Sequence, residues 1–150
     1  MATATAGISG FSVYLPPHRV QLQDWCRWSG DQWDKVEAVI GNAFRICGAN
    51  ENAYTMAATA VLRLIERYDV DPAKVGFLGF GTESSTDNSA GAVIIKGMVN
   101  QALKAQNAPE LSRECEVPEF KHACLGGMYA LKAATRYVAT DGSDRVAIVV

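Results

Sequence analysis

Two residues in the sequence could do chemistry together, and each follows an extended or apolar stretch. Cys124 lies in "HACLGG", where an extended segment runs into an amphipathic one, and Glu83 lies in "GTESS", directly after the apolar run 75–80. A thiolate is a strong nucleophile that can carry an acyl group as a thioester. A positioned carboxylate on a semi-buried loop can remove the acidic α-proton of such a thioester. The pair therefore indicates acyl-transfer chemistry.

Each residue also has a structural explanation. A single cysteine beside small residues is often a buried hydrophobic side chain, and Glu83 could be a solvated residue on the approach to a helix. The glycines after Cys124 would allow close backbone packing, whereas a helix N-terminus there would favour the thiolate. Catalysis is favoured only if the fold brings both loops to one edge.

The elements that must position these loops alternate between strand and helix patterns. This alternation predicts an α/β fold, with a mostly parallel sheet covered by helices on both faces. In such sheets functional groups gather beyond the carboxyl ends of strands, so we expect Glu83 and Cys124 to face a common cavity. In the last helix, Leu125, Met128, Leu131 and Ala134 or Thr135 are expected to point inward. The expected strands are 8–16, 75–80, 117–123 and 145–150, and the expected helices are 21–30, 32–41, 52–70, about 90–106 and one from near Cys124.

Composition excludes several classes of function. The 150 residues suit one domain, and 49% hydrophobic and 20% charged residues are an ordinary globular balance. The net charge of −2 is spread along the chain, which argues against a nucleic-acid or membrane partner. The opening "MATATAGISG" lacks the features of a signal peptide, so a cytoplasmic protein is expected.

The four cysteines do not form a metal-binding or disulfide pattern. Cys26, Cys47 and Cys115 have no partner motif, and they are expected to be free thiols without a role. The sequence holds only two histidines, so a metal site is not expected.

"GTESSTD" followed by "HACLGG" and "RVAIVV" resembles the hydroxymethylglutaryl-CoA synthase family of the thiolase superfamily, and the resemblance covers nearly the whole chain. It implies a thiolase-like fold, of which residues 1–150 would be the N-terminal half. By this resemblance Cys124 would be the acyl-accepting nucleophile and Glu83 the general acid/base. No cofactor is implied beyond acetyl-CoA as substrate, and a homodimer is expected.

The implied reaction has three steps. Cys124 takes an acetyl group from acetyl-CoA, Glu83 removes a methyl proton, and the resulting carbon nucleophile adds to the ketone of an acetoacetyl thioester. Water then releases a 3-hydroxy-3-methylglutaryl thioester. The amide of Cys124 or of its neighbours is a natural donor to the developing oxyanion. The acceptor could be bound to CoA or to an acyl carrier protein, as in polyketide β-branching members of the family.

The chain also departs from the family pattern. Leu125 replaces the aromatic residue that often follows the cysteine, and the family's essential histidine belongs to a second half. We expect the chain to be part of a longer one, because it stops within the run 145–150. His18 is expected at the surface and His122 in a loop, although a Cys124–His122 hydrolytic dyad is conceivable.

Other interpretations stay open at this point. The protein could be a condensing enzyme like ketoacyl-ACP synthase III, in which Glu83 is incidental, or a non-catalytic thiolase-like subunit. The tryptophans of the early helices could line a site for an acyl-CoA arm, or they could be core and interface residues. These tryptophans are Trp25, Trp28 and Trp33.

Overall fold

The computed structural model describes the whole chain except residues 1–5, 84, 86–87, 89 and 143. The chain divides into two compact units. One unit combines the N-terminal residues up to Tyr14 with Ala53–Val150, and the other is Leu15–Asn52. The candidate catalytic residues both belong to the first unit.

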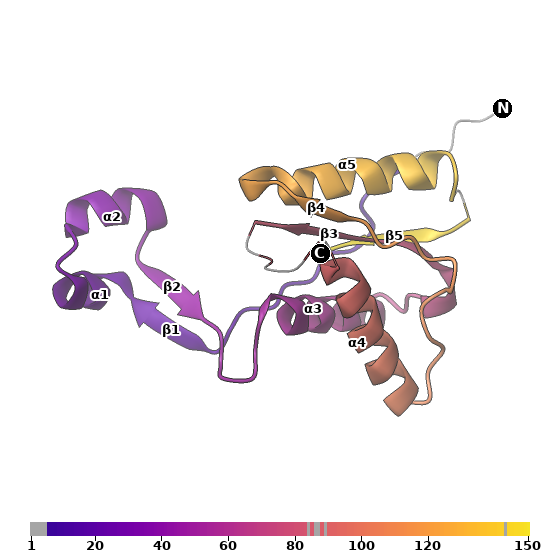
Figure 1. The fold of residues 1–150 in the computed structure, drawn as a ribbon, viewed down its shortest axis with the longest axis horizontal. Helices are drawn as coiled ribbons and strands as arrows, with labels where there is room; N and C mark the ends of the chain where they lie inside the picture. Colours follow the sequence, from indigo (N-terminus) through magenta and orange to yellow (C-terminus); the bar gives the residue numbers. More distant parts are fainter. Residues whose placement is uncertain (1–5, 84, 86–87, 89, 143) are drawn as a thin grey trace. The chain divides into compact units, whose positions relative to one another are not determined.

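The smaller unit is an antiparallel ribbon of two strands with two short helices between them. Strand β1 (His18–Gln21) pairs with β2 (Ala43–Ile46), and helices α1 (Leu22–Ser29) and α2 (Trp33–Ile40) connect them (Figure 1). Both helices end at glycines, as the sequence predicted, and these glycines have positive φ, 83° at Gly30 and 84° at Gly41. Leu22 and Cys26 are the buried hydrophobic residues of this unit.

The larger unit contains a parallel sheet with strand order β4-β3-β5. Its central strand is β3 (Val75–Thr82), flanked by β4 (Glu119–Lys121) and β5 (Val146–Val149). These are three of the four predicted strands, at the predicted places. The first six residues of β3 are all buried, which explains their continuous apolar run.

Helices cover both faces of this sheet, which confirms the predicted α/β class. Helices α3 (Ala53–Arg67) and α4 (Gly91–Ala105) pack on one face, and α5 (Gly126–Ala139) lies on the other (Figure 1). The largest fully buried side chains of the unit lie between β3 and the α3–α4 pair. They are Leu78, Ile95, Val61, Val75 and Val99.

The predicted strand at 8–16 is wrong. No strand is assigned there, and the carbonyls of Phe11 and Val13 accept hydrogen bonds from side chains of the α3 region instead of from a ladder. The hydroxyl of Tyr68 donates to Phe11 at 3.2 Å, and Arg63 donates to Val13 at 3.2 Å. Residue types alternate in this segment, but its apolar side chains Phe11, Val13 and Leu15 are the exposed ones, and a strand also needs a partner with which to pair.

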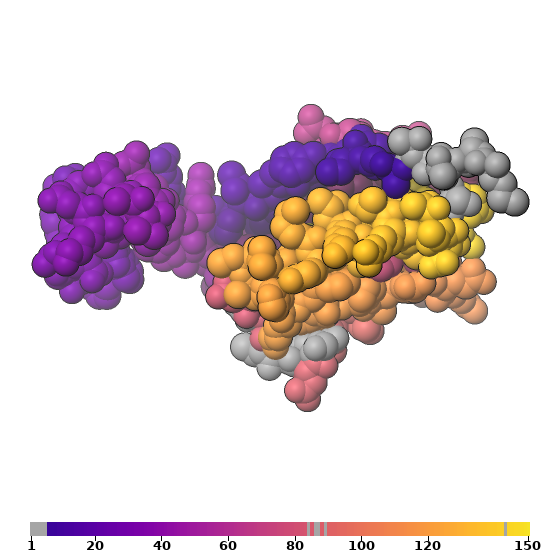
Figure 2. Space-filling model, turned by 90° about the horizontal axis from the view of Figure 1, so that it is seen from above, coloured from indigo at the N-terminus to yellow at the C-terminus, as the bar shows by residue number. Residues whose placement is uncertain are grey.

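The predicted inward face of α5 is also wrong in part. Leu125 and Met128 are 51% and 62% exposed, whereas Ala134 is buried as predicted and Ala130 is buried too. Figure 2 shows α5, in orange to yellow, at the surface of this face. The helix lies so close to β3 that a Cβ added at Gly79 would be 3.5 Å from Cβ of Ala130. Small residues occupy this part of the contact, whereas further along Tyr137 of α5 packs against Phe77 of β3, with ring centroids 5.4 Å apart.

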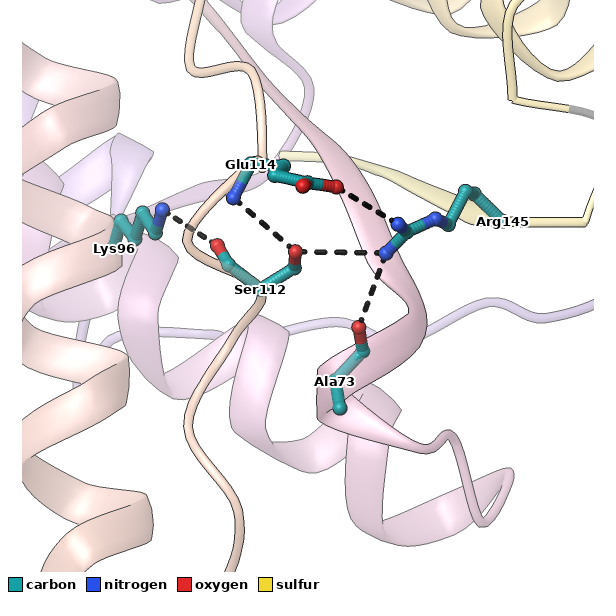
Figure 3. Close-up of polar contacts among 5 residues, drawn as sticks. All are labelled: Ala73, Lys96, Ser112, Glu114 and Arg145. Atoms are coloured by element: carbon teal, nitrogen blue, oxygen red, sulfur yellow. Dashed lines mark hydrogen bonds and ion pairs between the residues drawn. The ribbon is translucent and has the colours of Figure 1, made fainter.

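The long connection between α4 and β4 is held by a set of polar contacts (Figure 3). The guanidinium of Arg145 donates to Oε2 of Glu114 at 2.9 Å and, at longer range, to Oγ of Ser112 and the carbonyl of Ala73. From α4, Nζ of Lys96 donates to the carbonyl of Ser112 at 2.8 Å. The connection is thereby joined to α4, to the turn before β3 and to the start of β5.

Candidate active site

The carboxyl ends of β3 and β4 lie side by side. The parallel register places Thr82 opposite Lys121, and the amide of His122 donates to the carbonyl of Thr82 at 3.2 Å. Glu83 follows the first of these strands directly, and Cys124 follows the second after two residues. The predicted pairing of the two strands is confirmed. That the two side chains face one cavity stays a prediction.

Cys124 lies in a single 3₁₀ turn, Ala123–Leu125, immediately before α5. The turn is closed by the Leu125 amide, which donates to the His122 carbonyl at 2.9 Å, and by the Gly126 amide, which donates to Ala123. Ala123 has φ of 38°, in the left-handed region that disfavours a side chain. This sharp turn leaves the Cys124 side chain exposed at the start of a helix.

Glycines permit this arrangement. A Cβ at Gly81, in the last part of β3, would collide with the backbone of Gly126 and Gly127. A Cβ at Gly126 would lie 2.5 Å from the carbonyl oxygen of Phe120 and 3.0 Å from the amide nitrogen of Thr82. Backbone therefore packs on backbone at this edge of the sheet, and the close packing itself brings the helix start and its thiol to the end of β3.

Glu83 is exposed, so the semi-buried setting expected for it is not found. After Glu83, the "GTESSTD" motif is described only at Ser85, since residues 84, 86 and 87 lie outside the described residues. Ser85 is buried, with 7% of its surface exposed. Glu83 is thus accessible from outside, two residues before Ser85, whose side chain is held by a hydrogen bond.

Sequence reasoning missed the residue that fixes Ser85. The Glu119 carboxylate, on β4, accepts from the Ser85 hydroxyl at 2.6 Å and from the Gly91 amide at 2.7 Å. The available signal was an acidic residue shortly before Cys124, together with Ala90 at a helix start where a capping side chain would be usual.

The histidines have the surroundings that the simpler interpretation predicted. The His122 ring packs edge-on against Tyr129, with ring centroids 5.0 Å apart, and its side chain is exposed in the loop. His18 is exposed on β1, in the smaller unit. The structure therefore gives the proposed Cys124–His122 dyad no specific support.

The tryptophans, Cys26 and Cys47 belong to the smaller unit, and Cys115 belongs to the larger one. Trp25 packs against Trp28 and Phe44 in the smaller unit, at centroid distances of 4.9 and 5.4 Å. Burial raises the pKa of the Cys115 thiol, and nearby Lys96 offsets part of this effect. Cys26 is buried and Cys47 is exposed.

Within the described residues, no group of three or more His, Cys, Asp or Glu side chains is arranged to hold a metal ion. Nor does the described part of the chain contain a helix that is both long and apolar enough to cross a membrane.

Comparison with known proteins assigns the chain to a family. The family model described as "Hydroxymethylglutaryl-coenzyme A synthase N terminal" matches residues 3–150. Hydroxymethylglutaryl-CoA synthase A of Dictyostelium discoideum is 30% identical over 146 residues, which are 96% of this chain and 29% of that protein. The hydroxymethylglutaryl-CoA synthase of Pyrobaculum arsenaticum is 33% identical over 129 residues, 85% of this chain and 34% of that protein.

Solved structures agree with this assignment. MvaS in complex with 3-hydroxy-3-methylglutaryl coenzyme A matches with a TM-score of 0.80 and 32% identity, over 96% of this chain and 33% of that one. The hydroxymethylglutaryl synthase of the curacin pathway shares the fold, with a TM-score of 0.74 and 20% identity over 91% of this chain and 32% of that one. The chain spans about a third of the length of the relatives it matches. It belongs to the hydroxymethylglutaryl-CoA synthase family of the thiolase superfamily, and it corresponds to the N-terminal region of that family.

Proposed function

We propose that the protein condenses acetyl-CoA with an acetoacetyl thioester to give a 3-hydroxy-3-methylglutaryl thioester. The observation that carries the proposal is the hydrogen bond from His122 to Thr82, which joins the ends of the two strands that lead to Cys124 and Glu83. Membership of the family supports the same reaction.

Cys124 is the nucleophile of the first step. Its thiolate attacks the carbonyl carbon of acetyl-CoA, the C–S bond to CoA breaks, and CoA leaves as the thiol after taking a proton. The Leu125 and Gly126 amides are used to close the 3₁₀ turn. The amide of Cys124 is therefore the better candidate to donate to the oxyanion of the tetrahedral intermediate.

Glu83 acts in the second step. Its carboxylate removes a proton from the methyl group of acetyl-Cys124, and the carbon nucleophile so formed adds to the ketone of the acceptor. The new alkoxide takes up a proton, and water then cleaves the thioester to Cys124. Both side chains are exposed where the strands end, so one bound acyl group could reach both.

The acceptor is an acetoacetyl group on CoA or on an acyl carrier protein. One similar structure is described as a complex with 3-hydroxy-3-methylglutaryl coenzyme A, and another as a complex with a donor acyl carrier protein. The reaction needs no cofactor besides the thioester substrates. A cytoplasmic homodimer without a metal is part of the same proposal.

The test is to identify the residue that carries the acetyl group after reaction with acetyl-CoA. The intact protein is incubated with acetyl-CoA, and peptide mass spectrometry should locate one acetyl thioester on Cys124. Cys124→Ser should lose this adduct, and Cys47→Ser, which removes the other exposed thiol, is the matched control. Acetylation that persists in Cys124→Ser would contradict the assignment. An unmodified wild-type protein would favour the non-catalytic subunit.

A further inference from the structure

Glu119 connects two parts of the loop that carries Glu83. Its Oε1 accepts from the Ser85 hydroxyl at 2.6 Å, and its Oε2 accepts from the Gly91 amide at 2.7 Å. These partners lie 34 and 28 residues before it in the sequence. One carboxylate thus fastens the loop near its beginning and at its end, where α4 starts.

The contact with Gly91 takes the place of a local helix cap. The N-terminal amides of a helix have no partner within the helix, and Ala90 offers no capping side chain. A carboxylate is well suited to this place because the positive end of the helix dipole stabilises it. A Cβ at Gly91 would lie 2.7 Å from Oε2 of Glu119, so the close approach of this carboxylate to the start of α4 requires a glycine.

The contact with Ser85 has a different consequence. Glu83 lies between Thr82, whose carbonyl accepts from the His122 amide, and Ser85, whose hydroxyl donates to Glu119. Both holding groups come from the segment 119–122, which leads directly to Cys124. Thr82, through its carbonyl, and Ser85, through its hydroxyl, are therefore both tied to the segment that leads to Cys124.

We infer that Glu119 is a positioning residue that sets the place of the Glu83 carboxylate relative to Cys124. The inference rests on the proposed function. If Glu83 removes the proton in the second step only, loss of its position should slow condensation and leave acetylation of Cys124 intact. A displacement of about 1 Å can cost on the order of a hundredfold in rate.

The experiment uses the intact protein and three changes at this contact. Ser85→Ala removes the loop tether but keeps the bond to Gly91, and Glu119→Ala removes both. Glu119→Gln can keep both, because its amide oxygen can accept from Gly91 and its NH2 can donate to Ser85. Ser112→Ala is the matched control, since Ser112 also holds a loop through its hydroxyl but lies in the connection before β4.

Two rates are measured for each variant: acetylation of Cys124 by acetyl-CoA, and steady-state condensation with acetoacetyl-CoA. In Ser85→Ala and Glu119→Ala we expect kcat for condensation to fall about 10- to 100-fold, with acetylation within about twofold of wild type. Glu119→Gln should stay within about fivefold, and Ser112→Ala should match the wild type.

The outcomes separate the inference from the proposed function. Normal condensation in Ser85→Ala would overturn the inference and leave the proposed function standing. An equal fall in both rates in Ser85→Ala would overturn it too, because it would mean a general structural role. A wild-type protein that is acetylated but does not condense would refute the proposed function and the inference with it. If Glu119→Ala does not fold, Ser85→Ala decides.

Discussion

Cys124 and Ala123 show how a single turn can prepare a nucleophile. The left-handed backbone of Ala123 and the two glycines after Leu125 bring an exposed thiol to the start of α5. The other cysteines are placed differently, since Cys26 and Cys115 are buried and Cys47 is exposed in the smaller unit. Reactivity toward an alkylating agent should follow this difference.

We expect iodoacetamide to modify Cys124 and Cys47 in the native protein and to reach Cys26 and Cys115 only after unfolding. Burial both blocks access to Cys115 and raises the pKa of its thiol. Peptide mass spectrometry after a short native labelling gives the rate at each site. Labelling of Cys115 as fast as that of Cys124 would contradict the described burial.

At this scale the sequence indicated Cys124 and Glu83 from their residue types and their places after strands. It did not indicate Ser85 or Glu119, because their roles depend on a contact between residues 34 positions apart. Residue types show which groups can react. They do not show which distant side chains hold those groups in place.

Among the contacts between helices and strands, the packing of α5 on β3 is the one on which the site depends most. Gly81 and Gly126 allow helix and strand to meet backbone to backbone. Sequence periodicity found α5 and β3 but assigned the wrong face to part of α5. Large apolar residues usually point inward, but at the start of α5 the strand is too close to accept them.

Gly81→Ala should destabilise the protein by at least about 2 kcal/mol, since the added methyl group must displace helix backbone. Gly97→Ala is the control. Gly97 is exposed in the interior of α4, and a Cβ added there would meet open space, so alanine should stabilise the protein by up to about 1 kcal/mol. Chemical unfolding measures both effects, and equal changes of the same sign would contradict the packing described.

Arg145 holds the connection before β4 in place, so replacing it should lower the free energy of unfolding. Arg145→Met keeps much of the side-chain length but removes the bonds to Glu114, Ser112 and Ala73, so we expect a loss of about 1–2 kcal/mol. Arg27→Met breaks an exposed pair with Asp24 and should cost less than about 0.5 kcal/mol. Unfolding curves of the two variants that coincide would show that the contacts of Arg145 stabilise the protein no more than an exposed ion pair does.

At the scale of the whole molecule, the described chain leaves many large apolar side chains in contact with solvent. In the larger unit they include Ile8, Phe11, Val13, Leu125 and Met128. The sequence predicted the fold class, but neither the division into two units nor these exposed positions could be read from periodicity. Both depend on which elements meet across long separations in the sequence.

A polypeptide of residues 1–150 alone should therefore self-associate and should not condense acetyl-CoA with acetoacetyl-CoA. Exposed apolar patches favour association, and the chain spans about a third of the length of its relatives. Sedimentation velocity at several concentrations and a turnover assay check this. A monomer with the turnover of the intact protein would mean that residues 1–150 hold the whole catalytic apparatus.

The central claim is that Cys124 and Glu83 act in successive steps on one acyl group. The most direct test is a chase experiment on the intact Glu83→Ala protein, monitored by intact mass. After incubation with acetyl-CoA and removal of the excess, acetoacetyl-CoA is added. We expect the wild-type protein to lose its acetyl adduct as 3-hydroxy-3-methylglutaryl-CoA forms, and Glu83→Ala to become acetylated but to keep the adduct without forming this product. Formation of the product by Glu83→Ala at the wild-type rate would contradict the claim and would favour a condensing enzyme in which Glu83 is incidental.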